Sequence, residues 1–207
     1  MMTNNDRLKT LLGYSIPSII AMILSTTLTL TDGYFVGNYV GEKALASINL
    51  GLPILYLYLG LGLCIGVGGS VISGQLIGGK DRDKASSVFT ESIVTALAIT
   101  LLLSAGVYLL FNPILRLLKA EGELSVFFKS YYRVMLFSYP LLVLTTIFGM
   151  FIRTDGRPQV FMGISLLESV LNFILDYVFL KKLNMGVKGS AHATLIVKVV
   201  SCTICIL

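Results

Sequence analysis

The sequence is poor in charge. Asp, Glu, Lys and Arg together make up 13% of its 207 residues, about half the share typical of soluble domains, whereas 55% of the residues are hydrophobic. A soluble core of this size has no room for so much apolar surface, but a lipid bilayer accommodates it. The shortage of charge therefore excludes an ordinary soluble protein and places the chain in the membrane class.

Cysteine and histidine are also scarce. Cys64, Cys202 and Cys205 lie inside apolar runs, and the Cys202/Cys205 pair has no second pair near it, which argues against a metal or redox site. His192 is the only histidine, and no G-x-S-G motif accompanies it. No G-x-G-D motif surrounds an aspartate, so neither a serine-type nor an aspartyl intramembrane protease is favoured. We therefore expect no enzyme and no resident cofactor.

The basic residues lie mainly between apolar runs. A net charge of +5 in this pattern favours loops that meet phospholipid headgroups over a nucleic-acid surface, so no nucleic-acid partner is expected. No short apolar region with a small-residue cleavage site precedes the first run, which is expected to remain as a membrane span. Lys and Arg are nearly balanced between the two sides. Discounting the longest connection favours a cytoplasmic N-terminus. We expect the membrane to be the inner (plasma) membrane.

Six apolar segments are each long enough to cross a bilayer core about 30 Å thick at about 1.5 Å per residue. They lack the alternation of barrel strands, and lipid requires every backbone polar group to be paired internally, so we expect an all-α, polytopic fold. The third connection, residues 112–130, mixes apolar and charged residues as an interfacial segment would. The predicted spans are residues 11–35, 47–77, 88–111, 131–152, 159–180 and 187–207.

The second predicted span carries a small residue at every fourth position. Such a stripe lets a neighbouring helix backbone approach closely, and packing is the interpretation we favour over a ligand site. The stripe consists of Gly62, Gly66, Ser70, Gly74 and Gly78.

Polar side chains inside a bilayer are costly and are functional candidates by default. Asp32 lies late in the first predicted span, and Asp176 lies late in the fifth, which runs in the same direction. The sixth span runs back, and Thr194 lies early in it, so these side chains should share the half of the membrane opposite the N-terminus. Asn172 and Glu168 precede Asp176 by one and two turns on the same helix face. The spacing predicts an oxygen-rich pocket formed by Asp32, Asn172, Asp176 and Thr194.

Such a pocket suits a coupling ion. Burial of a carboxylate in a low-dielectric medium favours its protonated form, and a second nearby carboxylate favours it further. Two carboxylates with amide and hydroxyl oxygens also suit a small hard cation, so the same four residues are a candidate proton or Na⁺ site. The alternative, which spacing leaves open, is that Asp32 and Asp176 are helix-end residues in the headgroup zone.

Three further residues are candidates for lining a cavity or for helix movement. Lys198 either lines a cavity or pairs with an acid such as Glu168, and the sequence does not choose between the two. Pro17 lies about four turns before Asp32. A proline in a helix interior removes a hydrogen bond and permits a kink, so Pro17 is a candidate site of bending.

Taken together, the motifs resemble those of multidrug and toxic compound extrusion (MATE) transporters of the MOP superfamily. The resemblance covers essentially the whole chain, but only the first, six-helix half of a family member. It depends on the order and spacing of the stretches Thr31–Gly37, Ser73–Lys80, Arg153–Pro158, Asn172–Asp176 and Gly186–Thr194.

The resemblance implies that residues 1–207 form an N-terminal transmembrane lobe and that a C-terminal lobe is missing. It implies an antiporter that expels cationic amphipathic small molecules in exchange for protons or sodium, with the lipid bilayer and the missing lobe as partners. It assigns the ion site to Asp32, Asn172, Asp176 and Thr194, and the bending helix to the one that carries Pro17.

Three alternatives remain. A lipid-linked precursor flippase of the same superfamily would share the fold but favour a more cationic cavity, for which Lys198 is the one basic candidate. An intramembrane aspartyl protease would use Asp32 and Asp176 as its pair, without the usual motif. A half-size transporter would act as a dimer, and a reading frame continuing beyond Leu207 in the source DNA would decide against it.

Overall fold

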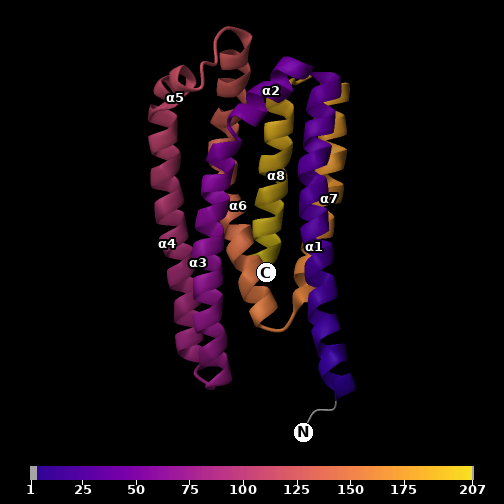
Figure 1. The fold of residues 1–207 in the computed structure, drawn as a ribbon, viewed down its shortest axis with the longest axis vertical. Coiled ribbons are helices and arrows are strands. Elements are labelled where there is room, and N and C mark those ends of the chain that lie inside the picture. Colours follow the sequence, from indigo (N-terminus) through magenta and orange to yellow (C-terminus); the bar gives the residue numbers. More distant parts are fainter. Residues whose placement is uncertain (1–3, 207) are drawn as a thin grey trace.

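The computed structural model describes residues 4–206, and these residues are almost entirely helical, with no strand among them. Figure 1 shows long helices running side by side, joined by short turns at both ends of the bundle. The elements are α1 (Asn4–Tyr39), α2 (Glu42–Leu50), α3 (Leu52–Gly78), α4 (Arg82–Leu109), α5 (Phe111–Leu117), α6 (Glu123–Thr154), α7 (Pro158–Asp176), the π-helical segment η1 (Tyr177–Lys182) and α8 (Val187–Ile206).

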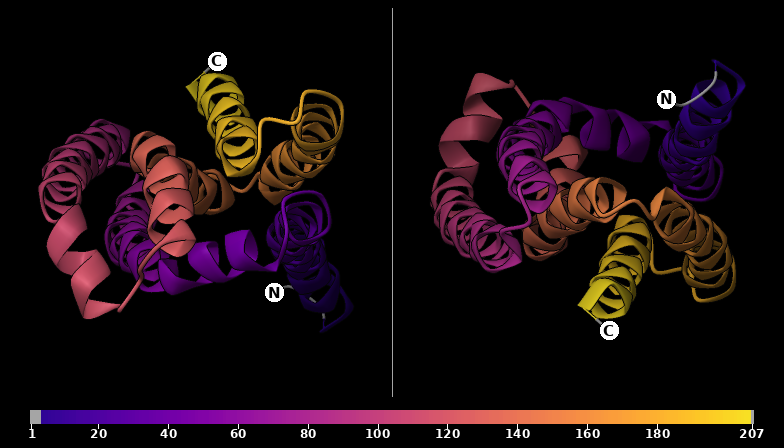
Figure 2. Two further views of the ribbon diagram at one scale, coloured as in Figure 1. Left: turned by 90° about the horizontal axis from the view of Figure 1, so that it is seen from above. Right: turned by 90° about the horizontal axis from the view of Figure 1, so that it is seen from below.

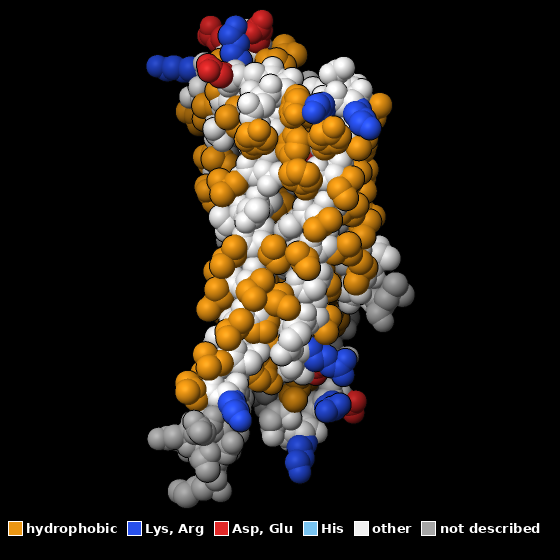
Figure 3. All heavy atoms as spheres, turned by 90° about the vertical axis from the view of Figure 1, so that its right-hand side faces the viewer, with side chains coloured by type: hydrophobic (Ala, Val, Ile, Leu, Met, Phe, Trp, Pro, Cys, Tyr) orange, Lys and Arg blue, Asp and Glu red, His pale blue; other side chains and the backbone are white. Residues whose placement is uncertain are grey.

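Within residues 4–206, six helices are long and apolar enough to cross a membrane, as the sequence predicts. They are Leu11–Tyr39 of α1, then α3, α4, α6, α7 continued by η1, and α8. Leu207, the end of the last predicted span, lies outside the described residues. Figure 3 shows the charged side chains of one face gathered at the two ends of the bundle, with an apolar belt between them. This distribution fits a chain that spans a bilayer.

The predicted span 47–77 is wrong at its start, because it contains two helices. The chain breaks at Gly51, between α2 and α3, and Pro53 occupies the first turn of α3, where its missing N–H costs nothing. A Cβ atom at Gly51 would overlap the ring of Tyr132, whose hydroxyl donates to the Ile48 carbonyl at 2.7 Å. The glycine therefore allows α2 to lie across one end of the bundle against α6, as seen from above in Figure 2.

The predicted start of the fourth span at residue 131 is also wrong, since α6 begins at Glu123. The charged residues of this region suggest a connection, but its apolar residues pack inward. Phe111, Leu115 and Phe128 are all buried. Lys43 of α2 and Glu123 form an ion pair at 2.7 Å, which ties the first turn of α6 to α2. The residues predicted as one long interfacial connection thus form α5, a short turn and the beginning of α6.

Helix α6 lies at the centre of the bundle and packs against α2, α3, α4 and α8. The small-residue stripe of α3 faces it as predicted. An added Cβ at Gly62 would lie 3.5 Å from the Val143 Cα, and one at Gly66 would lie 3.4 Å from the Ile147 Cα. Gly78 has nothing within 4 Å, so the last position of the stripe lies beyond this contact.

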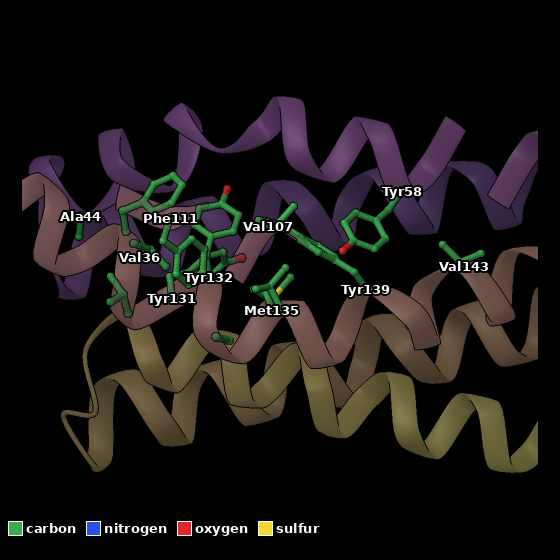
Figure 4. Packing of buried hydrophobic residues seen from close by; sticks show 14 of the residues in the cluster. Val36, Ala44, Tyr58, Val107, Phe111, Tyr131, Tyr132, Met135, Tyr139 and Val143 are labelled. Atoms are coloured by element: carbon green, nitrogen blue, oxygen red, sulfur yellow. The ribbon is translucent and has the colours of Figure 1, made fainter. Parts of the chain in front are cut away.

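Aromatic side chains fill much of the interface around α6 (Figure 4). Tyr58, Tyr132 and Tyr139 are almost completely buried, and the ring centroids of Tyr58 and Tyr139 lie 4.7 Å apart. Pro140, inside α6, cannot donate to the Leu136 carbonyl. Ser104 of α4 donates to that carbonyl instead, at 3.0 Å, and its hydroxyl lies 2.7 Å from the Tyr58 hydroxyl. A neighbouring helix thus pairs the backbone group that proline leaves free.

Candidate functional site

A cavity of about 170 Å³ lies inside the bundle, between α1, α2, α3, α6 and α8. Its wall is largely apolar and aromatic, with a few polar groups. Helix α2, which lies across the end of the bundle far from the N-terminus in Figure 1, contributes part of the wall. Among the polar and tyrosine side chains of the wall are Asp32, Tyr131, Tyr132, Ser190, Thr194 and Lys198.

Asp32 of α1 accepts hydrogen bonds from two hydroxyl groups of α8. Ser190 Oγ donates to Asp32 Oδ1 at 2.9 Å, and Thr194 Oγ1 donates to Asp32 Oδ2 at 3.4 Å. The sequence predicts the proximity of Asp32 and Thr194 but misses Ser190, which is fully buried. Ser190 lies one turn before Thr194 on the same helix face, so the i, i+4 spacing was the signal that could have identified it.

Asp176 and Asn172 of α7 have no exposed surface. The carboxyl group of Asp176 lies close enough to that of Asp32 for the two to interact. Within residues 4–206, no hydrogen-bond partner reaches either carboxylate oxygen of Asp176 or either amide atom of Asn172. Unlike Asp32 and Thr194, these two side chains are not part of the cavity wall. The predicted pocket is therefore divided between a cavity-facing part and a buried part.

The buried carboxylate of Asp176 lacks a donor and lies beside that of Asp32, so the pair needs a proton or a cation. An ionised carboxylate accepts hydrogen bonds and donates none, so Asp32 and Asp176 cannot satisfy each other unless one is protonated or a cation lies between them. Burying unpaired polar atoms is costly. Carboxylate, amide and hydroxyl oxygens are also the ligands that hard cations take. In the described part of the chain, no three His, Cys, Asp or Glu side chains are placed so that they could hold a metal ion together.

The two carboxylates do not lie at helix ends. Helix α1 continues to Tyr39 beyond Asp32, and η1 continues the helix to Lys182 beyond Asp176. Asp176 is also completely buried among protein side chains, unlike a helix-end residue exposed to headgroups. The backbone changes from α- to π-helical hydrogen bonding directly after Asp176. Single-turn π segments within helices occur frequently at functional sites.

Glu168 and Lys198 form a buried ion pair between α7 and α8. Lys198 Nζ lies 2.9 Å from Glu168 Oε1, and the side chains are only 9% and 11% exposed for Lys198 and Glu168, respectively. Lys198 is part of the cavity wall, whereas Glu168 is not. The two roles between which the sequence does not choose, lining a cavity and pairing with Glu168, are therefore both observed for Lys198.

Pro17 lies inside α1 and is buried. It has no N–H to donate to the Gly13 carbonyl one turn earlier. Gln159, at the start of α7, donates its side-chain Nε2–H to that carbonyl at 3.3 Å. The backbone irregularity at Pro17 is thus bonded to another helix.

Tyr131 is a site residue that the sequence analysis misses. It is 5% exposed, forms part of the cavity wall, and lies close enough to Asp32 and Asp176 for their charges to act on its hydroxyl. The predicted span begins at this residue, which placed it at the membrane interface. The extra turns at the start of α6 move Tyr131 into the interior.

A family model described as MatE matches residues 17–178 of the chain. The multidrug export protein MepA of Staphylococcus saprophyticus is 32% identical over 193 residues, which cover 93% of this chain and 43% of that protein. The chain thus spans less than half the length of the curated relatives that it matches.

Solved structures show the same arrangement of helices. One is described as the outward-facing conformation of a multidrug resistance MATE family transporter of the MOP superfamily. It has a TM-score of 0.88 and 29% identity, and the match covers 95% of this chain and 44% of that chain. Another, described as MATE in the bent conformation, also has a TM-score of 0.88 with 29% identity, over 95% of this chain and 44% of that chain.

Proposed function

The chain belongs to the MatE family of multidrug efflux transporters, which are not enzymes, and from this premise we propose that it is the N-terminal lobe of an ion-coupled antiporter. In this proposal the antiporter exports cationic amphipathic compounds in exchange for protons or sodium. A second lobe, which the relatives' greater length accommodates, would complete the drug cavity. The lobe would reside in the inner (plasma) membrane with its N-terminus in the cytoplasm.

The observation that carries the proposal is the environment of Asp176. Its buried carboxylate lies beside that of Asp32, and no donor in residues 4–206 reaches it. A proton shared by the pair, or a sodium ion bound between them, would remove the cost of two adjacent buried acceptors. The amide of Asn172 and the hydroxyl of Thr194 would supply further oxygen ligands to sodium.

Binding and release of this ion would be linked to the direction in which the transporter opens. A ligand shifts a conformational equilibrium only by its differential affinity for the two states. Asp32 is on α1 and Asp176 is on α7, so a change in the contact between these helices changes the ion site. Asp32 also lines the cavity, which gives the ion and a cationic compound access to one shared negative charge.

Bending of α1 at Pro17 would form part of this cycle. Pro17 lies in the half of α1 distant from Asp32, and the Gly13 carbonyl is paired by a side chain of α7 rather than within α1. A bend at this point would break no backbone hydrogen bond between residue 17 and the Gly13 carbonyl, because proline cannot form one. A relative with the same arrangement of helices is described in a bent conformation.

The flippase alternative is less well supported by the charges of the cavity. Lys198 is the basic residue of its wall, and Glu168 neutralises it. The dimeric half-size transporter remains an alternative, which a reading frame continuing beyond Leu207 would exclude.

The test is efflux of a fluorescent cationic compound from vesicles that carry the full-length polypeptide, with a proton or sodium gradient imposed. In the Asp32→Asn and Asp176→Asn variants, the ion gradient should no longer accelerate efflux of the compound. Both variants should still insert into the vesicle membrane. Asp155→Asn, which alters an exposed carboxylate in the α6–α7 turn, is the matched control and should transport normally. If both site variants keep wild-type ion dependence, the pair is not the coupling site.

A further inference from the structure

The Glu168–Lys198 pair is not used by the ion site, although it lies close to it. Lys198 follows Thr194 by one turn on α8, and Thr194 donates to Asp32. Asp32 and Lys198 are the two side chains of opposite formal charge among the described residues of the cavity wall. Any ligand in the cavity is therefore exposed to both charges.

An unpaired Lys198 would cancel much of the attraction of Asp32 for a cation. At an effective dielectric constant of about 20, a unit charge about 10 Å away changes the affinity for a monovalent ion about tenfold. A lysine ammonium in the wall would thus leave the cavity without a preference for cations. It would also weaken binding of the coupling ion at Asp32.

Glu168 neutralises the positive charge of Lys198, although Glu168 itself lies outside the cavity wall. Its carboxylate contacts the Lys198 ammonium at 2.9 Å, and the pair is nearly inaccessible to solvent. The attraction between the two is consequently little screened. Because Glu168 is not part of the cavity wall, it removes the positive charge of Lys198 without offering a second carboxylate to the ligand.

We propose that Glu168 is a specificity-determining residue of the transporter: by neutralising Lys198 it keeps the net charge of the cavity negative and so selects cations over anions. This inference rests on the proposed function, since it explains how the lobe discriminates among its substrates. It predicts that net charge, rather than the presence of the ion pair itself, determines the selectivity.

A purely structural ion pair makes a different prediction. Removing one partner of a buried pair leaves an uncompensated charge and is strongly destabilising, whereas replacing both by apolar or neutral residues is often tolerated. The double variant Glu168→Gln/Lys198→Met therefore separates the two roles, because it removes the pair but keeps the net charge of the cavity unchanged.

The experiment measures equilibrium binding to the full-length polypeptide in nanodiscs, with empty nanodiscs subtracted. The probes are radiolabelled phenyltrimethylammonium and benzenesulfonate, which are similar in size and opposite in charge. The wild type should prefer the cation. Glu168→Gln should lower the cation-to-anion affinity ratio about tenfold, and Lys198→Met should raise it about tenfold. The double variant should return the ratio to about the wild-type value.

An unchanged ratio in both single variants, or a double variant that behaves like Glu168→Gln, overturns the inference and leaves the proposed function intact. If Glu168→Gln does not insert into the membrane, the other two variants still test the inference. Lys198→Met should raise the cation-to-anion affinity ratio, and the double variant should leave it unchanged. A wild type that binds neither probe instead contradicts the proposed function itself, and the inference with it.

Discussion

Gln159 donates a side-chain hydrogen bond to the carbonyl of Gly13 across 3.3 Å, and this carbonyl is the one that Pro17 leaves without its helical partner. The same arrangement recurs at Pro140, where Ser104 donates to the Leu136 carbonyl at 3.0 Å. Both prolines lie inside helices that are long and apolar enough to span a membrane. A side chain from a neighbouring helix replaces the missing donor in each case.

Substitution of Gln159 by leucine should destabilise the protein through the Gly13 carbonyl. The loss of one hydrogen bond to a partly exposed acceptor should lower the free energy of unfolding by about 1 kcal/mol. The measurement is the apparent unfolding midpoint of the full-length polypeptide in detergent.

The control is the same substitution in a Pro17→Ala background, where the alanine backbone supplies the helical N–H for the Gly13 carbonyl. There Gln159→Leu should have almost no effect. Equal effects of Gln159→Leu in the two backgrounds would show that the hydrogen bond does not depend on the proline.

Gly51→Ala should be more harmful than its small size suggests. The added methyl group would overlap the ring of Tyr132 and displace the hydroxyl from the Ile48 carbonyl. Overpacking of this kind costs about 1–3 kcal/mol, whereas Tyr132→Phe, which removes only the hydrogen bond, should cost about 1 kcal/mol. In a Tyr132→Leu background, Gly51→Ala should be nearly neutral. If its effect persists there, the contact with the tyrosine ring is not the cause.

Much of the fold could be predicted from hydrophobicity alone. Each long apolar run is a membrane-crossing helix, because lipid leaves the backbone few other ways to pair its polar groups. The exceptions are local. The break at Gly51 depends on the approach of Tyr132, which is distant in sequence, and Pro53 alone does not reveal it because proline is common in membrane helices. The early start of α6 depends on tertiary packing of residues such as Phe128.

The candidate site could be predicted in part for the same reason. Counting turns from each helix end places Asp32, Asp176 and Thr194 at the same level of the bundle, and the contacts among them agree with this. Spacing along single helices does not give the rotation of one helix relative to another. It therefore could not reveal that Asp32 faces the cavity whereas Asp176 does not, or that Tyr131 shares the cavity wall with Asp32.

Ser190→Ala should change the ion dependence of transport without abolishing transport. Ser190 donates to Asp32 at 2.9 Å, and a carboxylate that loses a donor holds its negative charge less favourably. A hydrogen bond to a charged group contributes about 1.5–3 kcal/mol, so the half-maximal proton or sodium concentration should change about tenfold or more. The free carboxylate is less stable without this donor, so the coupling ion should be bound more tightly and its half-maximal concentration should fall.

The matched control is Ser201→Ala, which alters another buried serine of α8. It should leave the half-maximal ion concentration unchanged. A shift of similar size in both variants would point to a general disturbance of α8 and would contradict a specific role of Ser190.

The central claim, that the Asp32–Asp176 pair couples an ion to the exported compound, is tested most directly by running the exchange in reverse. Vesicles carrying the full-length polypeptide are given a gradient of a cationic compound and no ion gradient, and the movement of protons or sodium is recorded. The wild type should drive one of these ions against its own gradient, and Asp32→Asn and Asp176→Asn should move the compound, if at all, without moving the ion. Ion movement of wild-type size in both variants would contradict the account.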